Sequence, residues 1–127
     1  MINILKYVVL VICAVVGFLL VEPISFIYVV FFKERFTFKR VAGYLHNLAF
    51  EIDKFLNYQY RSLFNKVFIH KSGYQFGIFD QTISYVLGRN QISGTLTKFG
   101  KATVWFLDKI EKDHCVKAVE IYEGGTL

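Results

Sequence analysis

Residues 7–32 read YVVLVICAVVGFLLVEPISFIYVVFF, and this stretch decides the fold of the chain. It contains one charged side chain, Glu22, and one proline, Pro23. At a rise of about 1.5 Å per residue, a helix of this length exceeds the roughly 30 Å hydrocarbon core of a bilayer. Residues 7–21 are apolar on every side, and the rest of the chain is too short to cover such a helix in a core. We therefore predict a transmembrane anchor over residues 1–32.

A cleaved signal peptide is the alternative interpretation of this stretch, with Lys6 as its charged start. Apolar residues resume directly after Pro23, however, and no small-x-small cleavage pattern intervenes, which favours an anchor. Lys6 is the only basic residue before the span, whereas four basic residues and one acid follow it within residues 33–40. The positive-inside rule then predicts an inner (plasma) membrane protein with its N-terminus outside and its C-terminal domain in the cytoplasm.

Glu22 allows two interpretations. An acid inside a membrane span could bind an ion, relay a proton or line a pore. Alternatively, Pro23 suits the first turn of a helix, so the first helix would end or kink there and Glu22 would extend to the interface. The sequence shows no charged partner for Glu22 within the span, so we favour the structural interpretation.

Basic and aromatic residues are concentrated directly after the span. Residues 33–71 contain eight Lys or Arg and three acids, whereas basic and acidic residues balance from residue 72 onward. Interfacial aromatic rings and juxtamembrane cations suit a segment lying on anionic headgroups, and such a lipid bilayer is the partner we expect. The same mixture suits single-stranded nucleic acid, but we favour lipid because the anchor already holds this segment at the bilayer. The predicted membrane-interface residues are Lys33, Arg35, Phe36, Phe38, Lys39 and Arg40.

The remaining elements all show helical periodicity. Apolar residues of 41–56 fall in one sector at about 100 degrees per residue, which predicts an amphipathic helix, and 58–69 predicts a second one. Further helices are expected over 81–87, 96–112 and 114–123, with Asp80, Thr95 and Asp113 as their N-caps and Gly88 ending the first of them. Strand-like alternation is not sustained, so we predict an all-α protein. Its expected parts are the anchor (1–32), juxtamembrane amphipathic helices (33–71) and a small helical domain (72–127).

The predicted helix over 96–112 has two contrasting sides. We expect a buried stripe made of Leu96, Phe99, Thr103, Phe106, Leu107 and Ile110. The opposite side carries Trp105 among Lys98, Lys101, Lys109 and Lys112. This side is either an ordinary solvated basic face or a docking surface for anionic headgroups or an acidic partner, since Trp and Lys are typical of membrane interfaces.

A motif in residues 79–120 resembles a pattern found in small phage and prophage proteins of unknown activity. The pattern reads D-[EQ]-T-[LI]-S, then L-I-D-x-[IL], then H-C-x-x-[AS]; this chain has DQTIS at 80–84, LDKI at 107–110 without the residue between Leu and Asp, and HCVKA at 114–118. The resemblance implies a phage origin and no particular reaction. The matched positions are Asp80, Ser84, Asp108, His114 and Cys115, for which we expect structural roles as helix caps and links between short helices.

Catalytic and metal-binding patterns are weak. His114 and Cys115 could in principle form a zinc site with His70 or Asp80, but CxxC and HxxxH spacings are lacking, so we expect no metal and no cofactor. Cys13 lies in the span and Cys115 near the end, so a disulfide is not expected and Cys115 fits a reducing cytoplasm.

Two classes of function follow. The first is a non-enzymatic, phage-encoded inner-membrane protein that acts by protein or lipid contact at the cytoplasmic leaflet. It would modify the host envelope, exclude a competing infection or organise a complex, with a second copy of itself or a host membrane protein as possible partner. The second is a membrane-tethered enzyme or metal protein using Asp80, His114 and Cys115. We favour the first because no nucleophile, base and charge stabiliser stand at defined spacing.

Overall fold

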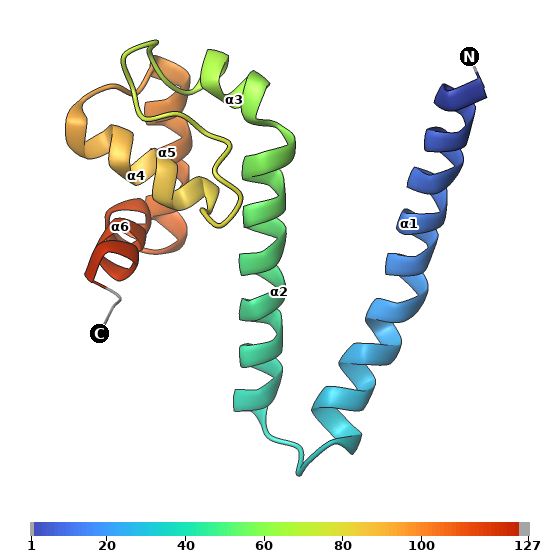
Figure 1. Cartoon of the computed structure of the whole chain (residues 1–127). Helices are drawn as coiled ribbons and strands as arrows, with labels where there is room; N and C mark the ends of the chain where they lie inside the picture. Colours follow the sequence, from blue (N-terminus) through green and yellow to red (C-terminus); the bar gives the residue numbers. More distant parts are fainter. Residues whose placement is uncertain (1, 125–127) are drawn as a thin grey trace. The chain divides into compact units, whose positions relative to one another are not determined.

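The computed structural model describes residues 2–124 of the chain, with side chains over residues 3–121. Within this part no β-strand forms, and the predicted all-α class is confirmed; Ile69 and Leu96 make one isolated antiparallel bridge. Helices follow one another along the chain (Figure 1) as α1 (Ile2–Ile27), the π-helical turn η1 (Tyr28–Phe32), α2 (Phe38–Gln59), α3 (Arg61–Val67), α4 (Ile83–Ser93), α5 (Lys98–Ile110) and α6 (His114–Gly124). Residues 125–127 of the predicted C-terminal domain lie outside the described part.

The chain divides into two compact units, residues 1–48 and 49–127. In the first, the segment Asn3–Phe32 is a helix long and apolar enough to cross a membrane, and none of its apolar window is buried within the protein. The expected helix end at Pro23 is wrong, because α1 continues through Pro23 to Ile27 and passes directly into η1. A helix that continues in this way keeps its backbone groups paired internally, as an apolar environment requires.

Polar contacts in the first unit join α1 to the start of α2. The Tyr44 hydroxyl donates to Glu22 Oε1 at 2.6 Å and lies 3.0 Å from Ser25 Oγ. Arg40 pairs with Glu34 at 2.6 Å and donates to the backbone carbonyl of Val29. Glu22 therefore has a hydrogen-bonding partner that the sequence did not reveal, which accords with a structural role for this acid.

α2 contains the amphipathic segment predicted from its periodicity, but two of its polar residues, Asn57 and Asp53, are turned towards the protein. Asn57 is completely buried, and its side chain donates to the carbonyls of Ile78 and Gln81 and accepts from the N–H of Gly77. Asp53 reaches the first turn of α4. Both residues hold the end of α2 to segments that follow twenty or more residues later.

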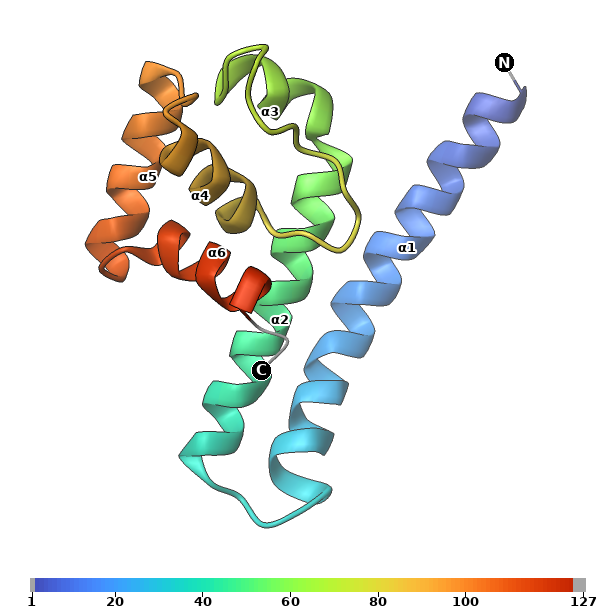
Figure 2. The ribbon, with the colours of Figure 1, turned by 60° about the vertical axis from the view of Figure 1, so that its left-hand side comes forward.

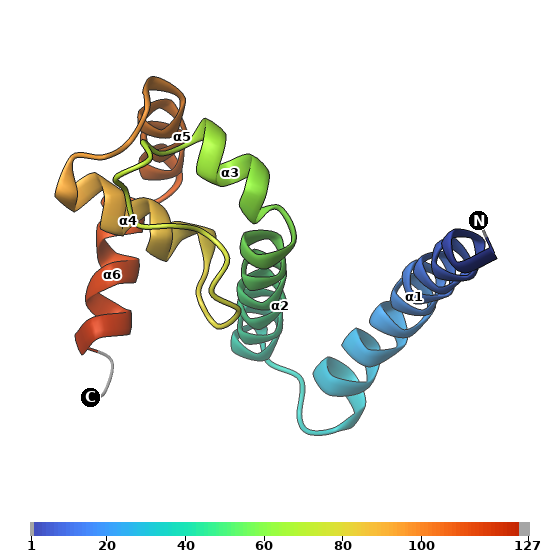
Figure 3. The same ribbon diagram turned by 45° about the horizontal axis from the view of Figure 1, so that its top comes forward.

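The core of the second unit lies where α4, α5 and α6 meet the segment after α3, as Figures 2 and 3 show. Gly88 lies inside α4, so the predicted helix end there is wrong; Gly94, at φ +72°, forms the C-cap instead. A side chain on Gly88 would overlap the carbonyl of Cys115, and one on Gly100 would overlap the carbonyl of Phe68. Because these two positions carry no side chain, the backbone of α4 can lie directly against that of α6, and the backbone of α5 directly against that of Phe68. The buried core residues are Ile69, Phe76, Tyr85, Val86, Leu87, Leu96, Val104, Cys115 and Val119.

Candidate functional site

The first turn of α4 carries the centre of the candidate site. Its N-cap is Thr82, whose side chain accepts from the N–H of Tyr85, so Asp80 is not the cap that the sequence suggested. Asp53 Oδ1 accepts from the N–H of Ile83 at 2.7 Å. A carboxylate at a helix N-terminus is stabilised by the exposed N–H groups and by the helix dipole. Asp53 thus links the end of α2 to the first turn of α4.

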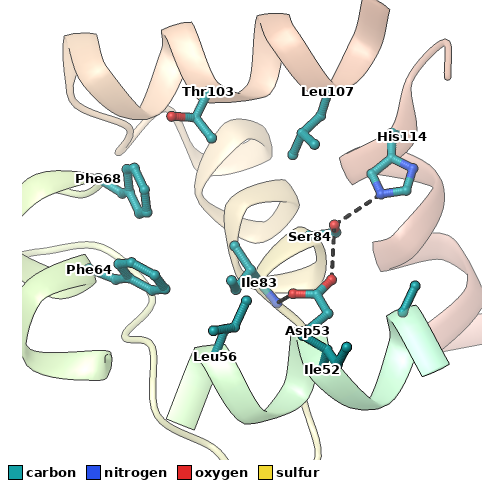
Figure 4. A pocket seen from close by; sticks show the side chains of 11 residues that line it. Ile52, Asp53, Leu56, Phe64, Phe68, Ile83, Ser84, Thr103, Leu107 and His114 are labelled. Carbon is teal, nitrogen blue, oxygen red and sulfur yellow. Dashed lines mark hydrogen bonds between the residues drawn. The ribbon is translucent and has the colours of Figure 1, made fainter. Parts of the chain in front are cut away.

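A chain of hydrogen bonds runs from Asp53 across α4 to α6 (Figure 4). Ser84 Oγ lies 3.4 Å from Asp53 Oδ2 and 3.0 Å from His114 Nε2. The other ring nitrogen, Nδ1, lies 2.9 Å from Glu111 Oε2. Ser84 and His114, for which the sequence suggested a linking role, are hydrogen-bonded to each other between α4 and α6, while Asp53 and Glu111 were not recognised from the sequence. No local signal identifies Asp53, since its partner on α4 is thirty residues away.

The two acids at the ends of this series of hydrogen bonds, Asp53 and Glu111, have pKa values shifted in opposite directions. Burial raises the pKa of the Asp53 carboxyl, and the hydrogen bonds from Ile83 and Ser84 offset only part of that rise. The pKa of Glu111 is lowered, chiefly by the hydrogen bond from His114. Protonation of both acids is therefore coupled to folding, that of Asp53 through its burial and that of Glu111 through its hydrogen bond with His114.

The raised pKa of Asp53 predicts a pH dependence of stability. Below about pH 4 the carboxyl is protonated in both the folded and the unfolded protein. As pH rises from there through the folded-state pKa, the unfolded protein releases the proton more readily, so the folded protein loses stability. Asp53→Asn keeps an oxygen for the N–H of Ile83 and removes this titration. We expect the free energy of unfolding of the variant to improve relative to wild type between pH 4 and pH 7, measured by urea unfolding in detergent micelles. The exposed Glu120→Gln serves as the control, and a constant difference at every pH would contradict the prediction.

A pocket of about 540 Å³ opens beside this hydrogen-bonded chain. Its volume lies in the range of about 300–1,000 Å³ that is usual for small-molecule sites. Figure 4 shows the aromatic rings of Phe64 and Phe68 on one side and the polar atoms of Asp53, Ser84 and His114 at the other end. The pocket is lined by Ala49, Ile52, Asp53, Leu56, Phe64, Phe68, Ile83, Ser84, Thr103, Leu107 and His114.

The residues expected to form an enzyme or metal site are not assembled as one. Asp80 lies in an exposed turn before α4, and the ring of His114 contacts Ser84 and Glu111. Cys115 is completely buried, and burial raises the pKa of its thiol to about 12, so it stays protonated at neutral pH. Asp108 is half-buried, with one carboxylate oxygen that has no hydrogen-bond partner. In residues 2–124 no group of three or more His, Cys, Asp or Glu is placed to hold a metal ion.

The exposed side of α5 differs from the prediction. Phe99, Phe106 and Ile110 were expected in the buried stripe but are 58%, 59% and 71% exposed, which overturns that assignment. The buried side consists of Gly100 and Val104, with Leu107 half-buried beside them. The reason is steric, because the small side of α5 can approach the backbone of Phe68 and the large side chains cannot.

The predicted basic side borders these exposed apolar residues. Trp105 is 62% exposed, and Lys109 Nζ lies 5.0 Å from the centre of its ring. Lys98, Lys101 and Lys112 are also exposed. We call the exposed apolar residues of α5, Trp105 and these four lysines together the α5 face.

The predicted membrane-interface residues lie around the turn between η1 and α2. Phe36 stacks on Phe31 at 5.1 Å between ring centres and meets Phe38 edge-on, and Phe38 is 82% exposed. Lys33, Arg35 and Lys39 are exposed. Arg40 is half-buried and paired with Glu34, so its charge is partly neutralised within the protein.

Comparison of the chain with protein-family models, with curated proteins and with solved structures finds no match.

Proposed function

We propose that this chain is a single-span inner-membrane protein that acts by contact with lipid or protein at the cytoplasmic leaflet, without catalysis. The apolar helix over Asn3–Phe32 supports the anchor, because none of its apolar window is covered by the rest of the protein. The basic residues that follow it support a cytoplasmic C-terminal domain. A phage origin stays a prediction of the motif resemblance, whereas a role in envelope modification, exclusion of a competing infection or organisation of a complex belongs to this proposal of action by contact.

The observation that carries this proposal is the α5 face. Three large apolar side chains of one helix are more than half exposed, and a tryptophan and four lysines stand beside them. A helix with this composition suits the plane of an anionic membrane surface, where apolar groups enter the headgroup region and cations meet phosphates. An anionic inner leaflet complements the charge of the α5 face.

Trp105 is the only tryptophan in the chain and therefore reports on the α5 face alone. We expect its fluorescence to be quenched in nanodiscs containing dibrominated phosphatidylglycerol. Lys101→Gln combined with Lys109→Gln should lose about 2 kcal/mol of surface attraction, about 30-fold in association, and the quenching with it.

The matched control for this experiment is Lys66→Gln combined with Lys71→Gln, which removes two exposed lysines from other elements. We expect this control to be quenched like the wild type. Equal quenching of both double variants, or none in the wild type, would show that the α5 face does not lie on lipid.

Reporter fusions after Val21, Arg40 and Leu127 test the proposed orientation. We expect cytoplasmic reporter activity at Arg40 and at the C-terminus, because the basic flank follows the span. Periplasmic activity at the C-terminus would contradict the proposed orientation and would again favour the signal-peptide interpretation.

A further inference from the structure

The pocket beside the first turn of α4 has two chemically different ends. The larger part is apolar, with the rings of Phe64 and Phe68 and the side chains of Leu56 and Leu107 around it. The smaller part presents Asp53, Ser84 and His114 (Figure 4). A pocket of this kind fits a molecule that is itself an alkyl chain with a polar end.

When Asp53 is ionised, the polar end has more hydrogen-bond acceptors than protons. When His114 donates through Nδ1 to Glu111, its Nε2 can only accept. Ser84 has one hydroxyl proton, yet both His114 Nε2 and Asp53 Oδ2 lie within 3.4 Å of its oxygen. One of these two acceptors therefore lacks the Ser84 proton at any moment, and a donor supplied by a ligand would fill that position.

The charges at this end select the ligand further. Asp53 lies in the pocket wall, so a phosphate or carboxylate head would meet its carboxylate, while Glu111, behind His114, is already paired with His114 and Lys117. A neutral head with hydroxyl groups supplies donors without repulsion. The complementary molecule is a single-chain lipid with hydroxyl groups at its head.

We propose that this pocket binds a monoacylglycerol-like lipid, with its acyl chain along the apolar wall and its hydroxyl groups on Asp53, Ser84 and His114. The site is built entirely from residues 49–114 and does not depend on the orientation of α1 or on the α5 face. It adds a ligand to a protein otherwise proposed to act through its surface.

The order Ser84, His114, Glu111 also matches a nucleophile, a base and an orienting acid. Catalysis needs free N–H groups where the oxyanion forms. Here Asp53 accepts from the N–H of Ile83, and its second oxygen lies 3.4 Å from Ser84 Oγ, so a negative charge occupies the region where another would develop. The geometry therefore favours holding a hydroxyl-bearing lipid over hydrolysing it.

The test uses the full chain in phosphatidylcholine nanodiscs and a monoacylglycerol that carries a diazirine in its acyl chain. After irradiation, mass spectrometry of peptides should locate the label on α3 or α5. Unlabelled monoacylglycerol should compete at least about tenfold better than lysophosphatidic acid of the same chain length, a factor equivalent to about 1.4 kcal/mol. Labelling confined to α1, or equal competition by the two lipids, would overturn the proposal.

Two variants locate the binding within the pocket. Thr103→Phe places a large side chain in the pocket opposite Leu56 and should abolish labelling of α3 and α5. Ala102→Phe, at an exposed neighbouring position of the same helix, should leave the labelling unchanged. Asp53→Asn removes the charge, keeps an acceptor for Ile83, and should reduce the preference over lysophosphatidic acid to below about threefold. Equal labelling of the two Phe variants, an unchanged preference in Asp53→Asn, or release of free fatty acid that stops in Ser84→Ala would each overturn the proposal.

Discussion

Gly88→Ala is expected to destabilise the second unit by about 3 kcal/mol or more. The added methyl group would overlap the carbonyl of Cys115 and lie 2.7 Å from a methyl group of Val119, and backbone cannot move aside as a flexible side chain can. Overpacking in a well-packed core costs about 1–3 kcal/mol, and separating two helices lies at the upper end. The loss is a large share of the roughly 5–15 kcal/mol by which folded domains are stable.

Amide hydrogen exchange in detergent micelles measures this effect directly. Protection of α4 and α6 should fall in Gly88→Ala, and the same change at Gly100 should act on α5. The matched control is Gly43→Ala in α2, where nothing lies near the new methyl group and a gain of about 0.5–1 kcal/mol is expected from helix propensity. If Gly88→Ala and Gly43→Ala behave alike, the close crossing of α4 and α6 is not present.

Asn90→Ala is expected to cost about 3 kcal/mol and to release the loop before α4. Asn90 is completely buried, and its amide donates to the carbonyls of Tyr74 and Val86, each at 2.8 Å. Its oxygen accepts from the N–H of Tyr74 at 2.8 Å and from the hydroxyl of Thr95 at 2.7 Å. Each buried group left without a partner costs about 1–3 kcal/mol. The loss should appear in urea unfolding and in faster exchange of the Tyr74 amide.

Two further variants separate hydrogen bonding from the loss of volume. Asn90→Asp keeps the size and the accepting oxygen but loses the two donated bonds and buries a charge, so we expect it to be at least as unstable as Asn90→Ala. Asn47→Ala changes an exposed asparagine of α2 and should alter stability by less than about 0.5 kcal/mol. A stable Asn90→Asp would show that the side chain of Asn90 mainly fills space.

The long helices could be predicted from sequence because each follows a single local pattern. The apolar run identifies α1, and a period of about 100 degrees identifies α2 over residues 41–56. Helix ends were less predictable. Gly88 looks like a terminator by residue type, yet α4 continues through it because the glycine serves a close crossing with α6. Residue type alone does not distinguish these two uses of glycine.

The site could be predicted only in part, since its members come from α2, α3, α4, α5 and α6. The motif indicated Ser84 and His114, and the structure places them 3.0 Å apart. Asp53 was one polar residue among several on α2, and its selection depends on where α4 begins. The face of α5 shows the same limit, because periodicity identifies an apolar side of a helix without stating whether protein or lipid covers it.

The burial of Cys115 allows the opening of the helical core to be measured. Its sulfur is enclosed where α4 crosses α6, so a thiol reagent can reach it only when that crossing comes apart. In a Cys13→Ser background, the rate of alkylation of Cys115 therefore reports how often the helical core opens locally.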